Sequence, residues 1–362
     1  MLNRVTRVLP RCLPPRSAVA LALLAGGCEP GTPAAPVAPP AADHHVHLLS
    51  PELVRDWKSL GVPFSRPDSH YTSVKVIFRD RPDGQAFLVS MAHIYGSEEF
   101  RGALDLSLAE EEARVRRAND QVAREVASAP ERFAGFCSVA LLRPYALAEI
   151  ARCHGDIGLA GLKIHLPSSG IRLGNPEHRK LLAEVMARAE EEQRPVLVHL
   201  VATDDEITEE NARRFVDEVV RPHPALELYL AHMGGNGGYR VSARRVVAAF
   251  LDFFAEGEDQ RQRPIFFELS AALLTRNTDG VPASRPEDTE ALARDLRRLG
   301  LHRVLFGSDY PVFDVEEHAR ALQERLPLTP AEFIQVLANR GAILTRPGRP
   351  RSTADSPPDE GV

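Results

Sequence analysis

Residues 195–200, Pro-Val-Leu-Val-His-Leu, form an apolar run of strand length that reaches a histidine at its end. Residues 226–232, Leu-Glu-Leu-Tyr-Leu-Ala-His, have the same form. Between them, residues 206–220 carry apolar side chains at three- and four-residue spacing on an otherwise charged segment, which is typical of an amphipathic helix. A strand, a helix and a second strand in this order form a βαβ unit, so the segment predicts an α/β fold with parallel strands.

The same alternation runs from Asp43 to about Thr345. Eight apolar runs are interpreted as strands: residues 43–49, 86–93, 133–142, 161–166, 195–200, 226–232, 265–270 and 303–309. Amphipathic helices are expected between them at residues 107–128, 145–153, 176–192, 206–220, 241–255 and 287–299. Eight such units predict a (β/α)8 TIM barrel, a single domain over residues 43–346. Helices at 316–326 and 330–344 are expected to close its bottom and side, and residues 57–81 are an insertion without a readable pattern.

The composition is that of a soluble globular protein. With 44% hydrophobic and 26% charged residues in 362, it excludes collagen-like, coiled-coil and fully disordered chains. A net charge of −6 offers no basic surface for nucleic acid. Four cysteines without C-x-x-C spacing exclude a disulfide scaffold or a cysteine metal site. Cys137 and Cys153 are expected either to pair, as an exported protein allows, or to be two buried thiols.

The N-terminus has the features of an export signal. An uncharged stretch, residues 17–27, has the length of a signal-peptide core and is too short to span a bilayer. It follows a basic segment with Arg4, Arg7, Arg11 and Arg16. Residues 1–27 are therefore predicted to be a signal peptide.

The signal ends Leu-Ala-Gly-Gly-Cys at Cys28, which resembles the bacterial lipobox and predicts lipidation of Cys28, with ordinary secretory cleavage as the alternative. Residues 28–42, rich in Pro and Ala, would tether the domain to the membrane, and residues 347–362 are expected to be a disordered tail. We expect a lipoprotein facing the periplasm. Glu29 after the cysteine, in place of an aspartate, favours the outer membrane.

Polar residues gather at the strand ends, where TIM barrels carry their catalytic groups. In residues 43–47, Asp-His-His-Val-His, alternation along the strand puts His45 and His47 on one face. The fifth and sixth runs reach His199 and His232, and the eighth ends at Asp309. Imidazole and carboxylate ligands from separate strands at one mouth predict a divalent metal site.

Four further polar residues near strand ends are candidates for substrate binding: Lys163, His165, Arg143 and Ser270. Lys163 and His165 share one strand face, which favours the pocket. Arg143, directly before Pro144, has a structural role as its alternative. The remaining histidines with predicted positions on helices, helix ends or between prolines are expected to be solvated: His154, His178, His223, His302 and His318.

These motifs resemble the amidohydrolase superfamily, in its amidohydrolase-related branch of lactonases, amide hydrolases and nonoxidative decarboxylases. The matching stretches are residues 43–47, Gly-Leu-Lys-Ile-His at 161–165, Val-His at 198–199, Ala-His-Met-Gly-Gly at 231–235 and Phe-Gly-Ser-Asp-Tyr-Pro at 306–311. The resemblance implies one divalent metal held by His45, His47, His199 and Asp309, with His232 beside it as a catalytic or orienting residue. Lys163 departs from this pattern, because in binuclear relatives a lysine on that strand is carboxylated and bridges two metals.

The expected activity is metal-dependent hydrolysis of an amide, lactone or ester of a small-molecule substrate. A metal lowers the pKa of its bound water to about 7, Asp309 would act as the base, and His232 would polarise the carbonyl or carry the leaving-group proton. Zinc is the first expectation, with manganese and cobalt as alternatives. A nonoxidative carboxylate decarboxylase and a non-catalytic ligand-binding lipoprotein are the alternative functions, and a homo-oligomer is left open.

Overall fold

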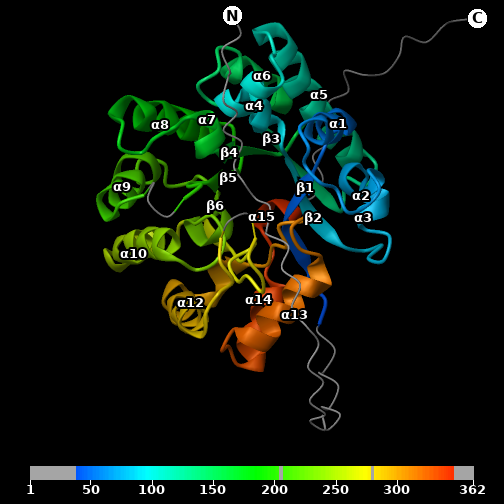
Figure 1. Ribbon diagram of the computed structural model, residues 1–362. Helices are drawn as coiled ribbons and strands as arrows, with labels where there is room; N and C mark the ends of the chain where they lie inside the picture. Colours follow the sequence, from blue (N-terminus) through cyan, green and yellow to red (C-terminus); the bar gives the residue numbers. More distant parts are fainter. Residues whose placement is uncertain (1–37, 204–206, 279–280, 346–362) are drawn as a thin grey trace, which may run out of the picture. The chain divides into compact units, whose positions relative to one another are not determined.

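The computed structural model describes residues 38–203, 207–278 and 281–345 (Figure 1). Its eight strands pair in parallel in sequence order, from β1 to β8. They are β1 Ala42–Leu48, β2 Gln85–Ser90, β3 Phe133–Ser138, β4 Gly161–His165, β5 Val196–His199, β6 Leu228–Leu230, β7 Ile265–Glu268 and β8 Val304–Leu305. Each lies within a predicted apolar run or within one residue of it. The predicted (β/α)8 barrel is confirmed.

The barrel closes between its first and last strands. The backbone N–H of His44 donates to the carbonyl of Phe306 at 3.0 Å, and the N–H of His47 donates to the carbonyl of Tyr310 at 2.9 Å. The buried carboxylate of Asp43 accepts from the N–H of Ser308 at 2.9 Å and from that of His45 at 3.2 Å. This seam brings the His-Val-His stretch of β1 beside the residues that follow β8.

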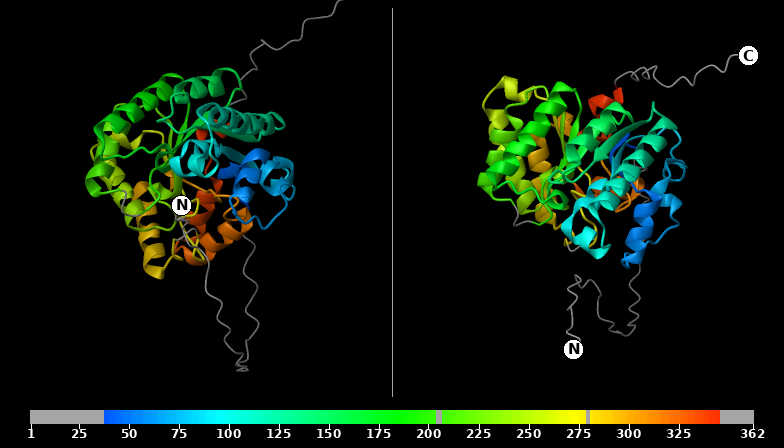
Figure 2. Two further views of the ribbon diagram at one scale, coloured as in Figure 1. Left: turned by 45° about the horizontal axis from the view of Figure 1, so that its top comes forward. Right: turned by 90° about the horizontal axis from the view of Figure 1, so that it is seen from above.

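Helices surround the strands on all sides (Figures 1 and 2). The longer ones are α1 Pro51–Ser59, α5 Leu108–Ala127, α6 Ala146–Gly155, α8 Pro176–Glu191, α10 Val241–Ala255, α12 Pro286–Leu299, α13 Val315–Arg325 and α14 Pro330–Ala338. The shorter ones are α2 Ser69–Thr72, α3 Val74–Ile77, η1 Ala92–Gly96, α4 Glu98–Ala103, α7 Leu166–Ser169, α9 Glu209–Arg214, η2 Phe215–Val220, η3 Ala231–Gly234, α11 Glu258–Arg261, η4 Leu301–Arg303 and α15 Ala342–Thr345.

Local signals explain where several helices begin. The Ser107 hydroxyl accepts from the N–H of Glu110, whose carboxylate accepts from the N–H of Ser107, so α5 starts with a capping box. Helices α8, α12 and α14 carry proline in the first turn, where its missing N–H costs nothing. The insertion at 57–81 contains the end of α1 together with α2 and α3.

The end of the chain passes below the barrel interior, where Phe87, Phe136 and Tyr229 pack against one another. A Cβ on Gly341 would lie 2.6 Å from the Tyr229 hydroxyl and 2.7 Å from the Phe87 ring, so only glycine allows this close approach. The prediction of one helix over 330–344 is therefore wrong. The chain leaves the helix at Asn339, packs Gly341 against the barrel floor, and resumes as α15.

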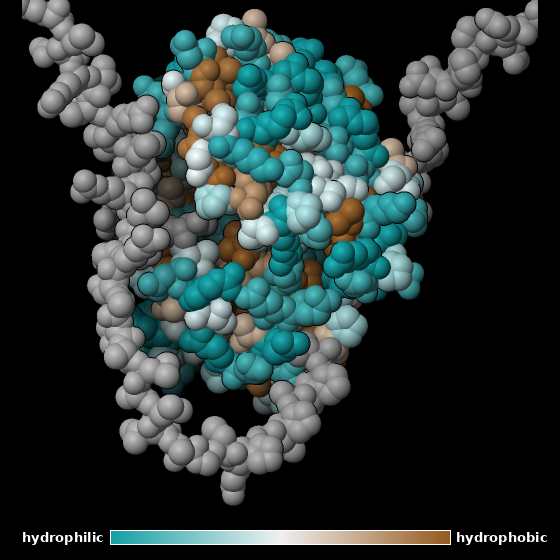
Figure 3. All heavy atoms as spheres, turned by 45° about the vertical axis from the view of Figure 1, so that its right-hand side comes forward, coloured by the Kyte–Doolittle hydropathy of each residue, from teal (hydrophilic) through white to brown (hydrophobic). Residues whose placement is uncertain are grey.

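Cys137 of β3 and Cys153 of α6 form a disulfide, which is the first of the two alternatives left open by the sequence. Within the described ranges, no helix is long and apolar enough to cross a membrane. One face of the molecule is mostly hydrophilic, with hydrophobic residues in small separate groups (Figure 3). The predicted signal peptide, the lipidation site at Cys28, most of the tether and the C-terminal tail lie outside the described residues.

Candidate metal centre

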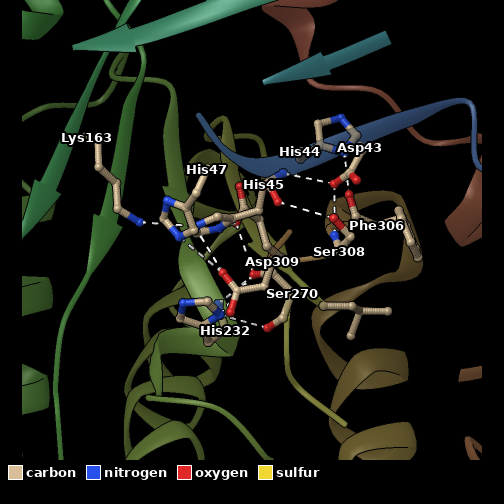
Figure 4. A network of polar contacts seen from close by, with 12 residues as sticks. Asp43, His44, His45, His47, Lys163, His232, Ser270, Phe306, Ser308 and Asp309 are labelled. Atoms are coloured by element: carbon tan, nitrogen blue, oxygen red, sulfur yellow. Dashed lines mark hydrogen bonds and ion pairs between the residues drawn. The ribbon is translucent and has the colours of Figure 1, made fainter. Parts of the chain in front are cut away.

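Two imidazoles and a carboxylate meet at the C-terminal mouth of the barrel (Figure 4). His45 and His47 lie on one face of β1, and Asp309 follows β8 across the closing seam. Oδ1 of Asp309 lies 3.3 Å from Nε2 of His47 and 3.6 Å from Nε2 of His45. One potential ligand atom from each of the three residues lies within 4.8 Å of the others. The arrangement brings together three of the four metal ligands expected from the sequence.

His45 is oriented by Glu268, at the end of β7. Nδ1 of His45 lies 2.7 Å from Oε2 of Glu268, and both side chains are 0% exposed. The other oxygen of Glu268, Oε1, has no hydrogen-bond partner among the described residues. With Nδ1 turned to Glu268, Nε2 of His45 faces His47 and Asp309, which is how a carboxylate fixes a histidine that binds a metal. Burial raises the pKa of Glu268 well above its usual range.

Glu268 was not among the site residues predicted from the sequence. The signal was present, because the run Ile-Phe-Phe-Glu at 265–268 ends in a carboxylate at the same barrel mouth, as the eighth run does.

Asp309 is held in an unusual backbone conformation, with φ at 61°. His232, Met233 and Ala271, which follow neighbouring strands, also have positive φ, and such conformations gather at functional sites where the surrounding fold holds them. Burial alone would raise the pKa of Asp309. Electrostatic interaction with His232, the hydrogen bond with His47 and the ammonium of Lys163 outweigh burial and hold this pKa well below its usual range. Asp309 is therefore a carboxylate anion at neutral pH.

His232 stands beside this group, its ring stacked on that of His45 with centroids 5.0 Å apart. Its Nδ1 lies 2.8 Å from the carbonyl oxygen of Ser270, so the proton sits on Nδ1 and Nε2 is left to face the cavity. The hydroxyl of Ser270 accepts from the N–H of His232 and contacts Glu268. Ser270 therefore lies behind His232, and the cavity lining does not include it.

His199 ends β5 as predicted, but it is not part of the three-residue group. Its Nε2 donates to the carbonyl of Val201 at 2.7 Å, which leaves Nδ1 as the nitrogen with a free lone pair. The ring contacts that of His232, with centroids 4.7 Å apart. His199 is thus in the wall of the cavity, one ring away from His45.

The three-residue group opens into a cavity of about 520 Å³, a volume suited to a small-molecule ligand. Apolar side chains at its wall include Leu49, Trp57, Met91 and Leu274. Its polar wall includes Lys163, His93, His165, His199 and His232. An apolar cavity with a few convergent polar groups is the usual form of a ligand site.

Lys163 is the cation of this cavity. Its Nζ lies 3.4 Å from Nε2 of His45, and the side chain is buried. Burial lowers the pKa of Lys163 to about 8, against the opposing charges of Glu268 and Asp309. A substantial fraction of Lys163 is therefore charged at neutral pH, beside the point where a substrate anion would meet the three-residue group.

Arg143 does not line the cavity, contrary to its assignment as a substrate-binding candidate. Its guanidinium donates to both carboxylate oxygens of Glu111, at 2.7 and 2.9 Å. Glu111 is fully buried on α5, and a buried carboxylate needs a charged partner. The structural alternative for Arg143 is the correct one.

The remaining histidines divide into two groups. His302 is exposed and His178 is half-buried, whereas His154, His223 and His318 are buried, so the prediction that all five are solvated is wrong for those three. His318 donates from Nε2 to the carbonyl of Leu269 at 2.9 Å, and this hydrogen bond offsets the cost of burying its ring. His93 lines the cavity but was not among the residues predicted for the site. It is the last residue of the second predicted run, 86–93, and the ends of other runs had already given candidate site residues.

Comparison with known proteins places these features in a family. The amidohydrolase family model matches residues 42–339. The gamma-resorcylate decarboxylase of Rhodococcus jostii (strain RHA1) is 25% identical over 260 residues, which cover 64% of this chain and 75% of that protein. The 2,6-dihydroxybenzoate decarboxylase from Rhizobium has a TM-score of 0.54 and 17% identity, over 83% of this chain and 96% of its own. A dihydroxybenzoic acid decarboxylase from Polaromonas sp. JS666, solved with bound manganese, has a TM-score of 0.54 and 15% identity, over 83% of this chain and 95% of its own.

These relatives correct the expected activity. A hydrolase of amides, lactones or esters was the first expectation, and it is wrong, because the relative from Rhodococcus jostii and the two solved relatives just described are decarboxylases of aromatic carboxylates. They favour the decarboxylase alternative. With a family model that matches nearly the whole barrel, and with the histidine and aspartate motifs at its mouth, this chain belongs to the amidohydrolase family.

Proposed function

We propose that this chain is a metal-dependent, nonoxidative decarboxylase of hydroxylated aromatic carboxylates. The observation that carries the proposal is the group His45, His47 and Asp309 at the floor of a cavity that also presents a buried cation, Lys163. The curated relative is a decarboxylase of this substrate class. A cavity of about 520 Å³ with apolar wall residues has room for a substituted arene, whose carboxylate would meet the charged floor.

The donor set fits a divalent cation. Burial lowers the pKa of His45 well below its usual range, so its imidazole is neutral and keeps a lone pair on Nε2. Asp309 supplies an anionic oxygen, and Nδ1 of His47 is buried without a hydrogen-bond partner among the described residues. His45, His47 and Asp309 would hold the ion, and Nδ1 of His199 is the candidate for a fourth ligand. A solved relative with bound manganese favours manganese over the zinc expected from the sequence, since these ligand types suit both ions.

When bound, the cation would supply a Lewis acid that neutralises and orients the carboxylate and the adjacent hydroxyl of the substrate. Lys163 would add a second positive charge on the same side. The apolar wall excludes water from the ring, which strengthens both interactions. These residues position the substrate; they do not take or give a proton.

Decarboxylation of an arene replaces one C–C bond with one C–H bond. The carboxylate leaves as carbon dioxide, its bonding electron pair stays with the ring, and a proton must reach the ring carbon that carried it. We assign delivery of that proton to Nε2 of His232. Its Nδ1 is fixed on the Ser270 carbonyl, so Nε2 faces the cavity. Burial lowers the pKa of His232, and the anionic Asp309 opposes this effect. Nε2 would therefore take a proton from water and pass it to the ring carbon, while Asp309, held as an anion, is itself a poor proton donor. Because hydrolysis is no longer the expected reaction, Asp309 is not assigned a role as the base that activates water.

The export signal and the lipid anchor at Cys28 remain part of the proposal. Their support is the basic segment followed by the lipobox-like ending at Cys28. The enzyme would then act on aromatic acids outside the cytoplasm, attached to a membrane through its lipid.

The test is carbon dioxide release from 2,6-dihydroxybenzoate and from 5-carboxyvanillate, by protein loaded with manganese or zinc. The wild-type protein is expected to release one carbon dioxide for each substrate consumed. His45→Ala is expected to lose both bound metal and turnover, whereas His302→Ala, at an exposed histidine, keeps both. Consumption of amides or lactones without carbon dioxide release would contradict the proposal.

A further inference from the structure

Two histidines form a second polar patch in the cavity wall. Neither belongs to the three-residue group, although the ring of His165 contacts that of His199, with centroids 4.3 Å apart. His93 lies on η1 after β2, and His165 ends β4. Their rings are nearly parallel, at 15°, with centroids 4.7 Å apart, and both line the cavity. His165 stands two residues beyond Lys163 on the same face of β4, about 6.6 Å further along the strand. This spacing is close to the length of one substituted benzene ring.

Hydrogen bonding fixes the ring proton of His165. Its Nδ1 accepts the backbone N–H of Ser168 at 3.1 Å, so in the neutral ring the proton is on Nε2. Among the described residues, no group contacts that Nε2–H by a hydrogen bond. It is a donor without a protein acceptor in the wall of the cavity.

His93 is fixed by a longer chain of contacts. Its Nδ1 lies 2.5 Å from the hydroxyl of Ser138. The backbone N–H and carbonyl of Ser138 are both held by the side-chain amide of Asn119, so the hydroxyl is anchored. No other contact of that hydroxyl is found in the described part of the chain, so its proton is free to be donated to Nδ1. This leaves an N–H at Nε2 of His93, beside that of His165.

We propose that His93 and His165 bind an oxygen substituent of the substrate at the far side of its ring from the carboxylate. The inference rests on the proposed function, which puts the carboxylate at His45, His47 and Asp309. Two neutral N–H donors suit a phenolic hydroxyl oxygen, whereas an apolar substituent would leave both buried donors unsatisfied. The pair therefore favours aromatic acids with a hydroxyl meta or para to the carboxylate, whereas 2,6-dihydroxybenzoate, with both hydroxyls beside its carboxylate, would leave the two donors unfilled.

The experiment measures binding by calorimetry, with the protein as purified and its metal retained. The ligands are phenol, resorcinol and hydroquinone, which differ only in the second hydroxyl and its position. For wild type, resorcinol or hydroquinone is expected to bind at least about tenfold more tightly than phenol, since each of the two neutral hydrogen bonds is worth about three- to tenfold. In His93→Phe/His165→Phe this advantage is expected to fall to within about threefold.

Two further variants separate the donor from the shape of the side chain. His165→Gln keeps an N–H donor and is expected to keep most of the preference, and His302→Phe, an exposed control, is expected to keep all of it. If the double variant does not fold, His165→Leu replaces it against His165→Gln. No preference in wild type, or an undiminished preference in the variant without donors, would overturn the inference. Because turnover is not the readout, a protein that shows the preference but releases no carbon dioxide contradicts the proposed function and not this subsite.

Discussion

Replacing Glu268 with glutamine tests whether the buried carboxylate behind His45 helps to hold a cation. The change keeps the shape and one acceptor oxygen but removes the ability to carry negative charge. The contact with Nδ1 of His45 is 2.7 Å long, and both groups are fully buried, so no solvent weakens the interaction that the substitution changes. Loss of such a supporting carboxylate typically weakens metal binding about 10- to 100-fold, or about 1.4–2.7 kcal/mol.

The assay is competition for the metal with a chelator of known affinity, followed by elemental analysis. Glu268→Gln is expected to release its metal at a 10- to 100-fold lower concentration of free chelator than wild type. The thermal unfolding of the two metal-free proteins is expected to stay similar. The matched control is Glu290→Gln, at an exposed position of α12. Metal affinity equal to that of wild type in Glu268→Gln would refute the reasoning that this carboxylate orients and supports His45.

The remaining predictions concern His232 as the proton donor, Lys163 as the buried cation, Asp43 at the seam between β1 and β8, and the export signal before Cys28. His232→Asn is expected to keep metal and substrate binding but to lower kcat by about 10²- to 10⁴-fold, as loss of a general acid does; unchanged kcat in stopped-flow carbon dioxide assays would move the proton to Asp309. Lys163, whose pKa is about 8, is charged below that pH and neutral above it, so the KM for the substrate is expected to rise as the pH increases through about 8. Lys163→Met is expected to remove this pH dependence. Identical pH profiles of KM in the two proteins would contradict the role of Lys163. Asp43→Ala leaves two buried backbone N–H groups without their acceptor and is expected to lower the free energy of unfolding by about 2–5 kcal/mol in urea titrations, whereas Asp43→Asn, which keeps an acceptor oxygen, costs less. Mass spectrometry of protein from a bacterial membrane fraction is expected to find a lipid-modified Cys28 as the first residue; an intact Met1 would contradict export.

The barrel and the positions of the main site residues were predictable because burial in a parallel barrel has a plain sequence signature. Strands covered on both faces become nearly continuous apolar runs, and several of these runs reach a polar residue at or near their ends, such as His199, His232 and Asp309. Alternation along β1 was sufficient to put His45 and His47 on the same face. These are local properties, and a single sequence records them.

Contacts between distant segments were not predictable in the same way. Glu268 orients His45 from 223 positions away, and Glu111 occupies Arg143 from 32 positions away. Nε2 of His199 is turned to a carbonyl two residues on, which depends on its rotamer. His93 reaches the cavity from η1, because β2 ends at Ser90 and the chain turns before the histidine. Spacing identifies which residues lie at the mouth, but it does not say which ring nitrogen faces which partner.

The most direct test of the central claim is the fate of the carboxyl carbon and of the ring carbon in one reaction. The metal-loaded protein is incubated in D2O with 2,6-dihydroxybenzoate labelled with 13C in its carboxyl group, and both products are analysed by mass spectrometry. We expect labelled carbon dioxide and, in equal amount, resorcinol with one deuterium on the carbon that lost the carboxylate. Recovery of intact labelled substrate under conditions where the protein holds its metal and binds resorcinol would contradict this expectation.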